Sequence, residues 1–391
     1  MTKTLTTISA VMLHLAIGSV YAWSILVDPI HDFTGWSILS LILVFSVTIL
    51  CLGLTASLLG NKVKSAHPGK LSALVLVLFL AGMILSSAAL HYRIFTLLLV
   101  GYGVFIGIAT GIGYLLPIPI IMTWYTRFKG IATGMVIAAF GFSSLMAAYG
   151  YHWCIITIGI EKAPAIVGGI LSVLILPSIF FLRSKKVIVE EMTEEQISTC
   201  KAPFSNVNFR QLWMLFFINI SIGISVVSCL APMTKQLFNI TGIEVAMFVG
   251  TIGLVNGFSR FCWAFLSDFI GRPITVAILI AFELTAILSL IHFQEFHIYK
   301  SCIFVIIACY GGMFALMPNY IADLFGTANV KSIFSHILSA WGLAGLIAPV
   351  TLRLLYEHYG NYANFFYSML VLCCINFFIG VILTERNINR I

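Results

Sequence analysis

Long apolar stretches, separated by short polar segments, recur along the whole chain. A helix that crosses the hydrocarbon core of a bilayer needs about 20 mostly apolar residues. Cuts at charged and turn residues leave twelve stretches of about that length, at approximately 5–27, 37–60, 71–90, 94–120, 130–156, 164–182, 212–233, 245–266, 274–293, 301–323, 332–352 and 363–383. This pattern predicts an all-α membrane protein with twelve transmembrane helices.

One polar segment is longer than the others and divides the twelve stretches into two sets of six. It covers residues 183–211 and carries five Lys or Arg and four Glu residues. We therefore expect a six-helix bundle at 1–182, a cytoplasmic linker at 183–211 and a second six-helix bundle at 212–391.

The two halves also carry a similar proline motif at equivalent places. The fourth stretch contains Tyr114-Leu-Leu-Pro117, and the tenth contains Phe314-Ala-Leu-Met-Pro318. Transporters built from two parallel repeats show internal similarity of this kind. The motif favours two pseudo-repeats of six helices each.

The composition excludes a soluble enzyme. Of the 391 residues, 60% are hydrophobic and only 9% are charged, whereas a soluble protein carries about 25% charged residues. Most of the surface must therefore face lipid, and the bilayer is the first expected partner. The net charge of +7 does not indicate a nucleic-acid partner, because no run of Lys and Arg is longer than Lys185-Lys186 and none is interleaved with aromatic residues.

The positions of Lys and Arg predict the orientation of the chain. Cytoplasmic loops of membrane proteins are richer in Lys and Arg than exported loops. With both termini inside, fifteen of the 21 Lys and Arg residues fall on the cytoplasmic side, five fall outside, and Arg260 lies within a helix. We expect a multi-pass protein of the cytoplasmic (inner) membrane with cytoplasmic N- and C-termini.

Arg260 is the charged residue with the clearest functional meaning. A charge well inside a spanning helix costs about 2.5–3.5 kcal/mol on the insertion scale, so it usually faces a cavity and has a partner. The guanidinium group suits a carboxylate or a phosphate ligand. The alternative is a structural ion pair with Glu283 of the next helix, and both states could alternate if Glu283 held the arginine when substrate is absent.

Glu283 and His14 are the candidates for proton coupling. Glu283 is a carboxyl group at mid-membrane, where intramembrane acids often carry protons; the alternative is a structural hydrogen bond to a neighbouring helix. His14 shares a helix face with Gly18 and Tyr21, so an imidazole and a phenol lie together in the membrane. The alternative for His14 is an ordinary core histidine.

No residue pattern indicates a metal, a cofactor or an enzymatic reaction. The nine cysteines are scattered and lack metal-ligand spacing. No Walker loop, zinc-ligand set or Ser-His-Asp arrangement stands out. We expect neither a cofactor nor catalytic chemistry.

The segment from Ala264 to Arg272 resembles the G-x-x-x-D-x-x-G-R loop of the major facilitator superfamily, with Ala264 in place of the first glycine. Asp268, Gly271 and Arg272 predict a tight turn and a charge latch that differs between inward-open and outward-open states. The matching loop of the first half, residues 60–70, lacks the aspartate, so a gating role there is in doubt.

Several segments resemble the oxalate/formate antiporter family of that superfamily. They are Gly18-Ser-Val-Tyr21-Ala-Trp23, Gly111-Ile-Gly-Tyr114-Leu-Leu-Pro117, Trp124-Tyr-Thr-Arg127-Phe-Lys-Gly130, Phe325-Gly326 and Ser339-Ala-Trp341-Gly-Leu-Ala-Gly345. The resemblance implies an alternating-access carrier of small carboxylates, in which a helix 8 arginine binds the carboxylate and aromatic residues enclose it. Carried onto this sequence, the arginine is Arg260, and the wall residues are His14, Tyr21, Tyr114, Tyr310, Phe314 and Trp341.

Trp341 departs from the family pattern. The resemblance implies a lysine in helix 11 as a second cation of oxalate-exchanging members, and Trp341 stands at that position. One fixed cation balances one carboxylate, whereas a dianion would keep an uncompensated charge in a low-dielectric site. We therefore expect a monocarboxylate such as formate, lactate or pyruvate, carried by a monomeric protein through proton symport or anion exchange.

Two other functions remain open at this point. One is transport of a larger polar or polycarboxylate solute, such as a siderophore, or export of a drug, because the fold alone does not fix the substrate. The other is a membrane sensor that does not transport, although the chain has no large soluble segment to carry a signal.

Overall fold

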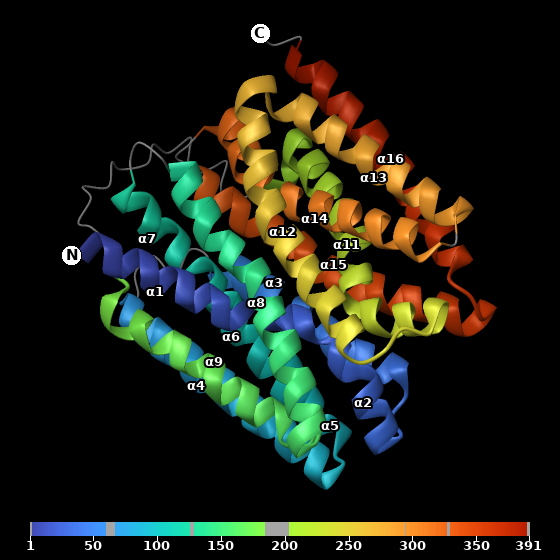
Figure 1. The fold of residues 1–391 in the computed structure, drawn as a ribbon. Helices are drawn as coiled ribbons and strands as arrows, with labels where there is room; N and C mark the ends of the chain where they lie inside the picture. The colour runs from blue at the N-terminus through green and yellow to red at the C-terminus, as the bar shows by residue number, and fades with distance from the viewer. Residues whose placement is uncertain are drawn as a thin grey trace.

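The computed structural model describes residues 2–59, 67–125, 129–183, 203–293, 295–326 and 329–388. This part of the chain is nearly all helical (Figure 1). It contains twelve helices that are long and apolar enough to cross a membrane. The prediction of an all-α protein with twelve transmembrane helices is confirmed.

The first half forms six spans, two of which consist of more than one helical segment. Its elements are α1 (Thr2–Ile17), η1 (Gly18–Ala22), α2 (Ser24–Thr34), α3 (Ile38–Leu59), α4 (Pro68–Tyr92), α5 (Phe95–Leu98), η3 (Leu99–Ile106), α6 (Gly107–Leu115), α7 (Pro117–Trp124), α8 (Lys129–Ile158) and α9 (Ala163–Phe181).

The second half forms six spans with continuous helices. Its elements are η4 (Pro203–Ser205), α11 (Val207–Phe238), α12 (Ile243–Ile270), α13 (Arg272–His292), α14 (Phe296–Phe325), α15 (Val330–Tyr359) and α16 (Ala363–Ile388). In Figure 1 the blue-to-green helices of the first half lie mostly at the left, and the yellow-to-red helices of the second half lie at the right.

The first span differs from its predicted extent of 5–27. It is interrupted by η1, where Gly18 lies against the backbone carbonyl of Phe140 and leaves no room for a side chain. The chain then continues as α2, because Leu26, Val27 and Ile30 are fully buried on one side of this helix. Packing against the second half, and not hydropathy alone, decides where this span ends.

The start of α11 also differs from the expected boundary of the linker at 183–211. The helix begins at Val207, because the side-chain oxygen of Asn206 accepts hydrogen bonds from the backbone N–H groups of Asn208 and Phe209 at 2.9 and 3.3 Å. Such a cap satisfies donors at a helix start. The middle of the expected linker, residues 184–202, lies outside the described residues.

Two helix pairs hold the halves together: α3 packs on α15, and α8 packs on α12. Glycines form the closest approaches. Gly53 of α3 lies against the backbone of Gly342, and a Cβ atom at Gly141 of α8 would lie 2.7 Å from the backbone nitrogen of Gly257. Small residues let helix backbones approach closely inside a membrane, where a hydrophobic driving force between helices is missing.

The halves also meet at the face of the bundle opposite to the N-terminus. There α2 of the first half packs on α11 of the second (Figure 1). The ammonium group of Lys235 lies 3.8 Å from a carboxylate oxygen of Asp28. Burial raises the pKa of the Asp28 carboxyl group above its usual value, and the charge of Lys235 opposes this effect.

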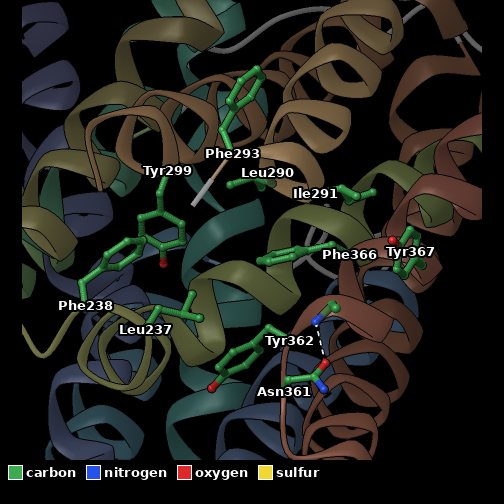
Figure 2. Close-up of a pocket in the computed structure, with 11 residues that line it drawn as sticks. Leu237, Phe238, Leu290, Ile291, Phe293, Tyr299, Asn361, Tyr362, Phe366 and Tyr367 are labelled. Carbon is green, nitrogen blue, oxygen red and sulfur yellow. Dashed lines mark hydrogen bonds between the residues drawn. The ribbon is translucent and has the colours of Figure 1, made fainter. Parts of the chain in front are cut away.

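A hollow of about 260 Å³ lies at the same face, inside the second half. It opens between the ends of α11, α13, α14 and α16, and its lining is mainly apolar and aromatic, with Tyr299, Phe366 and Leu290 among the side chains around it (Figure 2). None of the predicted site residues lines it. This hollow is therefore separate from the candidate site described next.

Candidate functional site

The structure brings the predicted substrate-binding residues together at the junction of the two halves. The first half contributes His14 from α1, Tyr21 from η1 and Tyr114 from α6. The second half contributes Arg260 from α12, Tyr310 and Phe314 from α14, and Trp341 from α15. Each of these side chains is at most 3% exposed, so together they form a closed aromatic cage around one buried charge.

Arg260 has no acidic partner among the described residues. Its Nη2 atom donates a hydrogen bond to the Asn256 side-chain oxygen at 3.0 Å, one helical turn away. Its guanidinium carbon lies 4.9 Å from the centroid of the Phe314 ring. The Nε and Nη1 atoms have no hydrogen-bond partner within the described part of the chain. Because burying an unpaired charge is unfavourable, these donors are suited to an anionic ligand.

The alternative ion pair between Arg260 and Glu283 is wrong for this structure. Both carboxyl oxygens of Glu283 accept hydrogen bonds from the Asn219 amide nitrogen, at 3.1 and 3.2 Å. The Cys373 thiol lies 3.9 Å from the same group. Glu283 therefore faces α11 and α16 inside the second half, whereas Arg260 faces α14 and the junction between the halves.

The aromatic residues of the cage link the two halves directly. The hydroxyl groups of Tyr21 and Tyr310 are 2.6 Å apart and share a hydrogen bond across the junction. The ring of Tyr114 lies 5.3 Å from that of Trp341, which in turn lies 4.7 Å from the ring of Phe314. A movement of one half against the other must therefore rearrange the cage.

Phe140 of α8 belongs to the cage, although the sequence did not indicate it. Its ring lies 5.1 Å from that of Tyr21, 5.5 Å from that of Tyr114 and 6.3 Å from that of Trp341. The sequence contains 31 phenylalanines, and one Phe within an apolar helix carries no distinguishing pattern. Only the packing of α8 across the junction identifies it.

Two polar groups of the cage lack an acceptor. The Tyr114 hydroxyl and the Trp341 indole nitrogen are buried and donate no hydrogen bond to any described residue. Buried polar groups in folded proteins are usually paired. Their concentration around Arg260 indicates a site that a polar ligand completes.

The free space beside the cage is small. A cavity of about 10 Å³ is lined by Tyr21, Asn256, Ser144 and four apolar or glycine residues. This is roughly the space of one water molecule. This cavity is too small for an organic solute, so the site is closed in the conformation observed.

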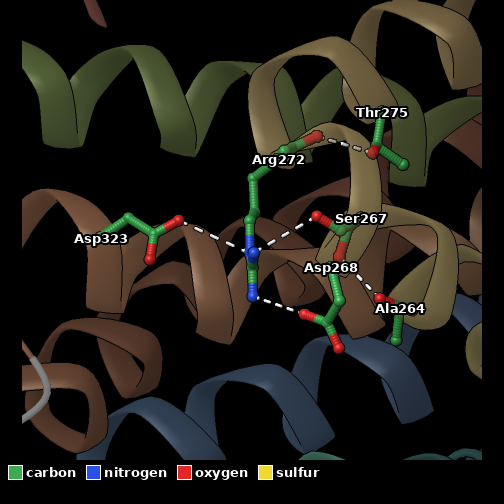
Figure 3. Close-up of polar contacts among 7 residues, drawn as sticks. Ala264, Ser267, Asp268, Arg272, Thr275 and Asp323 are labelled. Carbon is green, nitrogen blue, oxygen red and sulfur yellow. Dashed lines mark hydrogen bonds and ion pairs between the residues drawn. The ribbon is translucent and has the colours of Figure 1, made fainter. Parts of the chain in front are cut away.

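The predicted loop between the eighth and ninth spans forms the expected tight turn (Figure 3). Gly271 has a φ of +85°, which favours glycine. Arg272 contacts Asp268 at 2.7 Å and also Asp323 of α14, through Nε, at 3.5 Å. These contacts tie α12, α13 and α14 together within the second half. The sequence did not indicate Asp323 as a partner, and most of the matching first-half loop, residues 60–66, lies outside the described residues.

Comparisons with known proteins agree with this architecture. The chain is 22% identical over 352 residues to YhjX, an uncharacterised MFS-type transporter of Escherichia coli (strain K12), and covers 86% of it. It is 25% identical over 356 residues to the oxalate:formate antiporter of Oxalobacter formigenes and covers 81% of it. A shorter match, 28% identical over 114 residues, is to apicoplast pyruvate carrier 2 of Toxoplasma gondii, of which it covers 17%.

The fold matches a solved transporter over nearly its full length. A bacterial homologue of the human lysosomal transporter Spinster, in an inward-facing and unoccupied conformation, superimposes with a TM-score of 0.71 over 98% of this chain and 97% of that one, at 13% identity. The sequence profile of the Major Facilitator Superfamily matches residues 4–349. With twelve spans and a site enclosed between two halves, the chain belongs to the Major Facilitator Superfamily and is a transporter, not an enzyme.

Proposed function

We propose that this protein is a secondary active carrier of a small monocarboxylate, of the formate, lactate or pyruvate type. The observation that carries the proposal is Arg260, a fully buried cation at the junction of the halves with no acidic partner among the described residues. A substrate carboxylate neutralises this charge and accepts hydrogen bonds from its free Nε and Nη1 atoms.

The charge of the site supports a small monoanion. Trp341 stands where the family resemblance implies a second cation, so a dianion is left with one uncompensated charge in the closed cage. Two relatives, an oxalate:formate antiporter and a pyruvate carrier, support the class of small organic anions.

Transport in this proposal proceeds by alternating access. The halves rock along the glycine contacts of α3 with α15 and of α8 with α12, and the bond between Tyr21 and Tyr310 breaks as the cage opens. The proposed orientation places both termini in the cytoplasm and the Asp28–Lys235 pair at the outer face of the inner membrane. The protein acts as a monomer, by anion exchange or by proton symport with His14 or Glu283 as the proton carrier.

Counterflow in proteoliposomes tests the proposal. Purified protein is reconstituted with a panel of radiolabelled mono-, di- and tricarboxylates, with and without a pH gradient. We expect exchange of formate, lactate or pyruvate and little exchange of oxalate or citrate. Exchange of oxalate or citrate without any monocarboxylate refutes it and favours a polycarboxylate carrier.

A pair of variants tests the role of Arg260. Arg260→Gln removes the buried charge, so we expect exchange to fall at least about tenfold, because a charged hydrogen bond in a buried site is worth about 1.5–3 kcal/mol. Arg93→Gln removes an exposed arginine that only stacks on Phe33 and serves as the matched control. Equal exchange by the two variants, at equal amounts of reconstituted protein, assigns Arg260 a structural role.

A further inference from the structure

Two of the unpartnered groups of the cage are neutral hydrogen-bond donors. The Tyr114 hydroxyl and the Trp341 indole N–H are both fully buried, and neither donates a hydrogen bond to a described residue. They come from different halves, and their rings lie 5.3 Å apart. A donor left without a partner in a closed site is unfavourable, so both groups require an acceptor atom from a ligand.

These donors lie close to the charged group. The Phe314 ring contacts both Arg260, at 4.9 Å from the guanidinium carbon, and the Trp341 ring, at 4.7 Å between centroids. The side chains that carry the guanidinium group and the two neutral donors are therefore connected through neighbouring rings in one part of the cage.

The two donors of the cage, the Tyr114 hydroxyl and the Trp341 indole N–H, are uncharged, and this determines which ligand oxygen suits them. A neutral O–H or N–H group satisfies an uncharged oxygen but does not neutralise a second carboxylate. The indole N–H can only donate, and a carbonyl oxygen has two lone pairs that can accept from two donors. A carbonyl oxygen next to the carboxylate thus matches the cage, because it supplies acceptor positions for the neutral donors in addition to those that the carboxylate uses at Arg260.

We propose that Tyr114 and Trp341 recognise an uncharged oxygen at the second carbon of the substrate and make the carrier selective for 2-oxo monocarboxylates. The inference rests on the proposed function and narrows it: Arg260 binds the carboxylate, and the two neutral donors bind the 2-oxo group. Sites that hydrogen-bond a substrate oxygen reject analogues that lack it much more strongly than hydrophobic pockets reject a missing methylene.

Pyruvate and propionate provide the test, because they share three carbons and one carboxylate and differ in the 2-oxo group. Unlabelled acids compete with radiolabelled pyruvate, and in parallel with radiolabelled formate, for counterflow at neutral pH. We expect pyruvate to compete at a concentration at least about tenfold lower than propionate.

Variants that keep the rings locate this selectivity. Trp341→Phe removes the indole N–H and Tyr114→Phe removes the hydroxyl, and each variant retains an aromatic ring. We expect the two changes together to bring pyruvate and propionate within about twofold, through weaker competition by pyruvate. Tyr151→Phe is the control, since this buried tyrosine of α8 contacts Met83 outside the cage.

The outcomes separate this inference from the function on which it rests. If propionate competes as well as pyruvate in the wild-type protein, 2-oxo selectivity is refuted while monocarboxylate transport stands. An unchanged difference in the Trp341→Phe/Tyr114→Phe double variant refutes the assignment to these two residues. If no monocarboxylate exchanges with the wild-type protein, both proposals fall. The wild-type comparison needs no variant and decides the selectivity even if a variant does not fold.

Discussion

Gly141 lies where the backbones of α8 and α12 approach most closely, and Gly141→Ala is expected to weaken this contact. The added Cβ atom would lie 2.7 Å from the Gly257 nitrogen and 2.9 Å from the Gly253 carbonyl oxygen. Favourable contacts between non-bonded atoms lie near 3.5–4.0 Å, so the helices must separate by about 1 Å. Overpacking of this kind costs about 1–3 kcal/mol.

Gly134 of the same helix provides a matched control. A Cβ atom added at Gly134 meets nothing within 4 Å. Alanine is a better helix former than glycine by about 1 kcal/mol, so Gly134→Ala is expected to leave stability unchanged or to raise it. The two substitutions are chemically identical and gain the same helix propensity, so we expect their free energies of unfolding to differ by the overpacking cost alone, about 1–3 kcal/mol.

Thermal unfolding of the purified protein in detergent measures this difference without knowledge of the substrate. We expect the midpoint for Gly141→Ala to fall at least about 3 °C below that for Gly134→Ala. Counterflow of labelled substrate is the second assay, and the rate is expected to fall only for Gly141→Ala. Equal midpoints for the two variants would refute the close contact of α8 with α12 as described.

Three further predictions concern the junction and the buried acid. The raised pKa of Asp28 means that its carboxyl group contributes stability below its unfolded pKa and loses this contribution as pH rises through the folded pKa. The free energy of unfolding of the wild type relative to Asp28→Asn should therefore fall as the pH rises in an acidic series. A difference that does not change with pH contradicts this reasoning. Tyr21→Phe and Tyr310→Phe each remove the hydrogen bond across the junction, so a double-mutant cycle on the free energy of unfolding should give a coupling energy of about 0.5–1.5 kcal/mol. If the effects of the two changes on the free energy of unfolding simply add, the hydrogen bond is absent. Glu283→Gln removes the titratable group but keeps an acceptor for the Asn219 amide. If Glu283 carries the transported proton, this variant should lose uptake driven by a pH gradient while anion exchange continues. Gradient-driven uptake at the wild-type rate leaves Glu283 a structural role.

The hydropathy pattern was sufficient for the number and order of the spans. Each span needs about 20 apolar residues in a row, and this local requirement can be read without knowledge of any neighbour. The same reasoning identified Arg260, because a charge inside an apolar stretch is conspicuous in one dimension. The six aromatic and histidine wall residues came from the family resemblance, and they do meet around Arg260 in the structure.

Partners between helices could not be derived in this way. Arg260 and Glu283 lie in consecutive apolar stretches of the sequence, so an ion pair between them was a natural expectation. In the structure Glu283 instead binds Asn219 of α11, while Arg260 binds Asn256 and stacks on Phe314. The direction of a side chain depends on the rotation of its helix about its own axis, which the packing of all neighbouring helices determines.

By itself the sequence determined that this chain spans a membrane twelve times and buries one unusual cation, because burial of charge and exposure of apolar surface are properties of single segments. Only the tertiary structure decided that this cation lacks an acidic partner among the described residues, that Phe140 joins the cage and that neutral donors lie beside the charge. These features depend on contacts between α1, α6, α8, α12, α14 and α15. Such contacts arise only when helices that are distant in sequence pack together across the junction of the two halves.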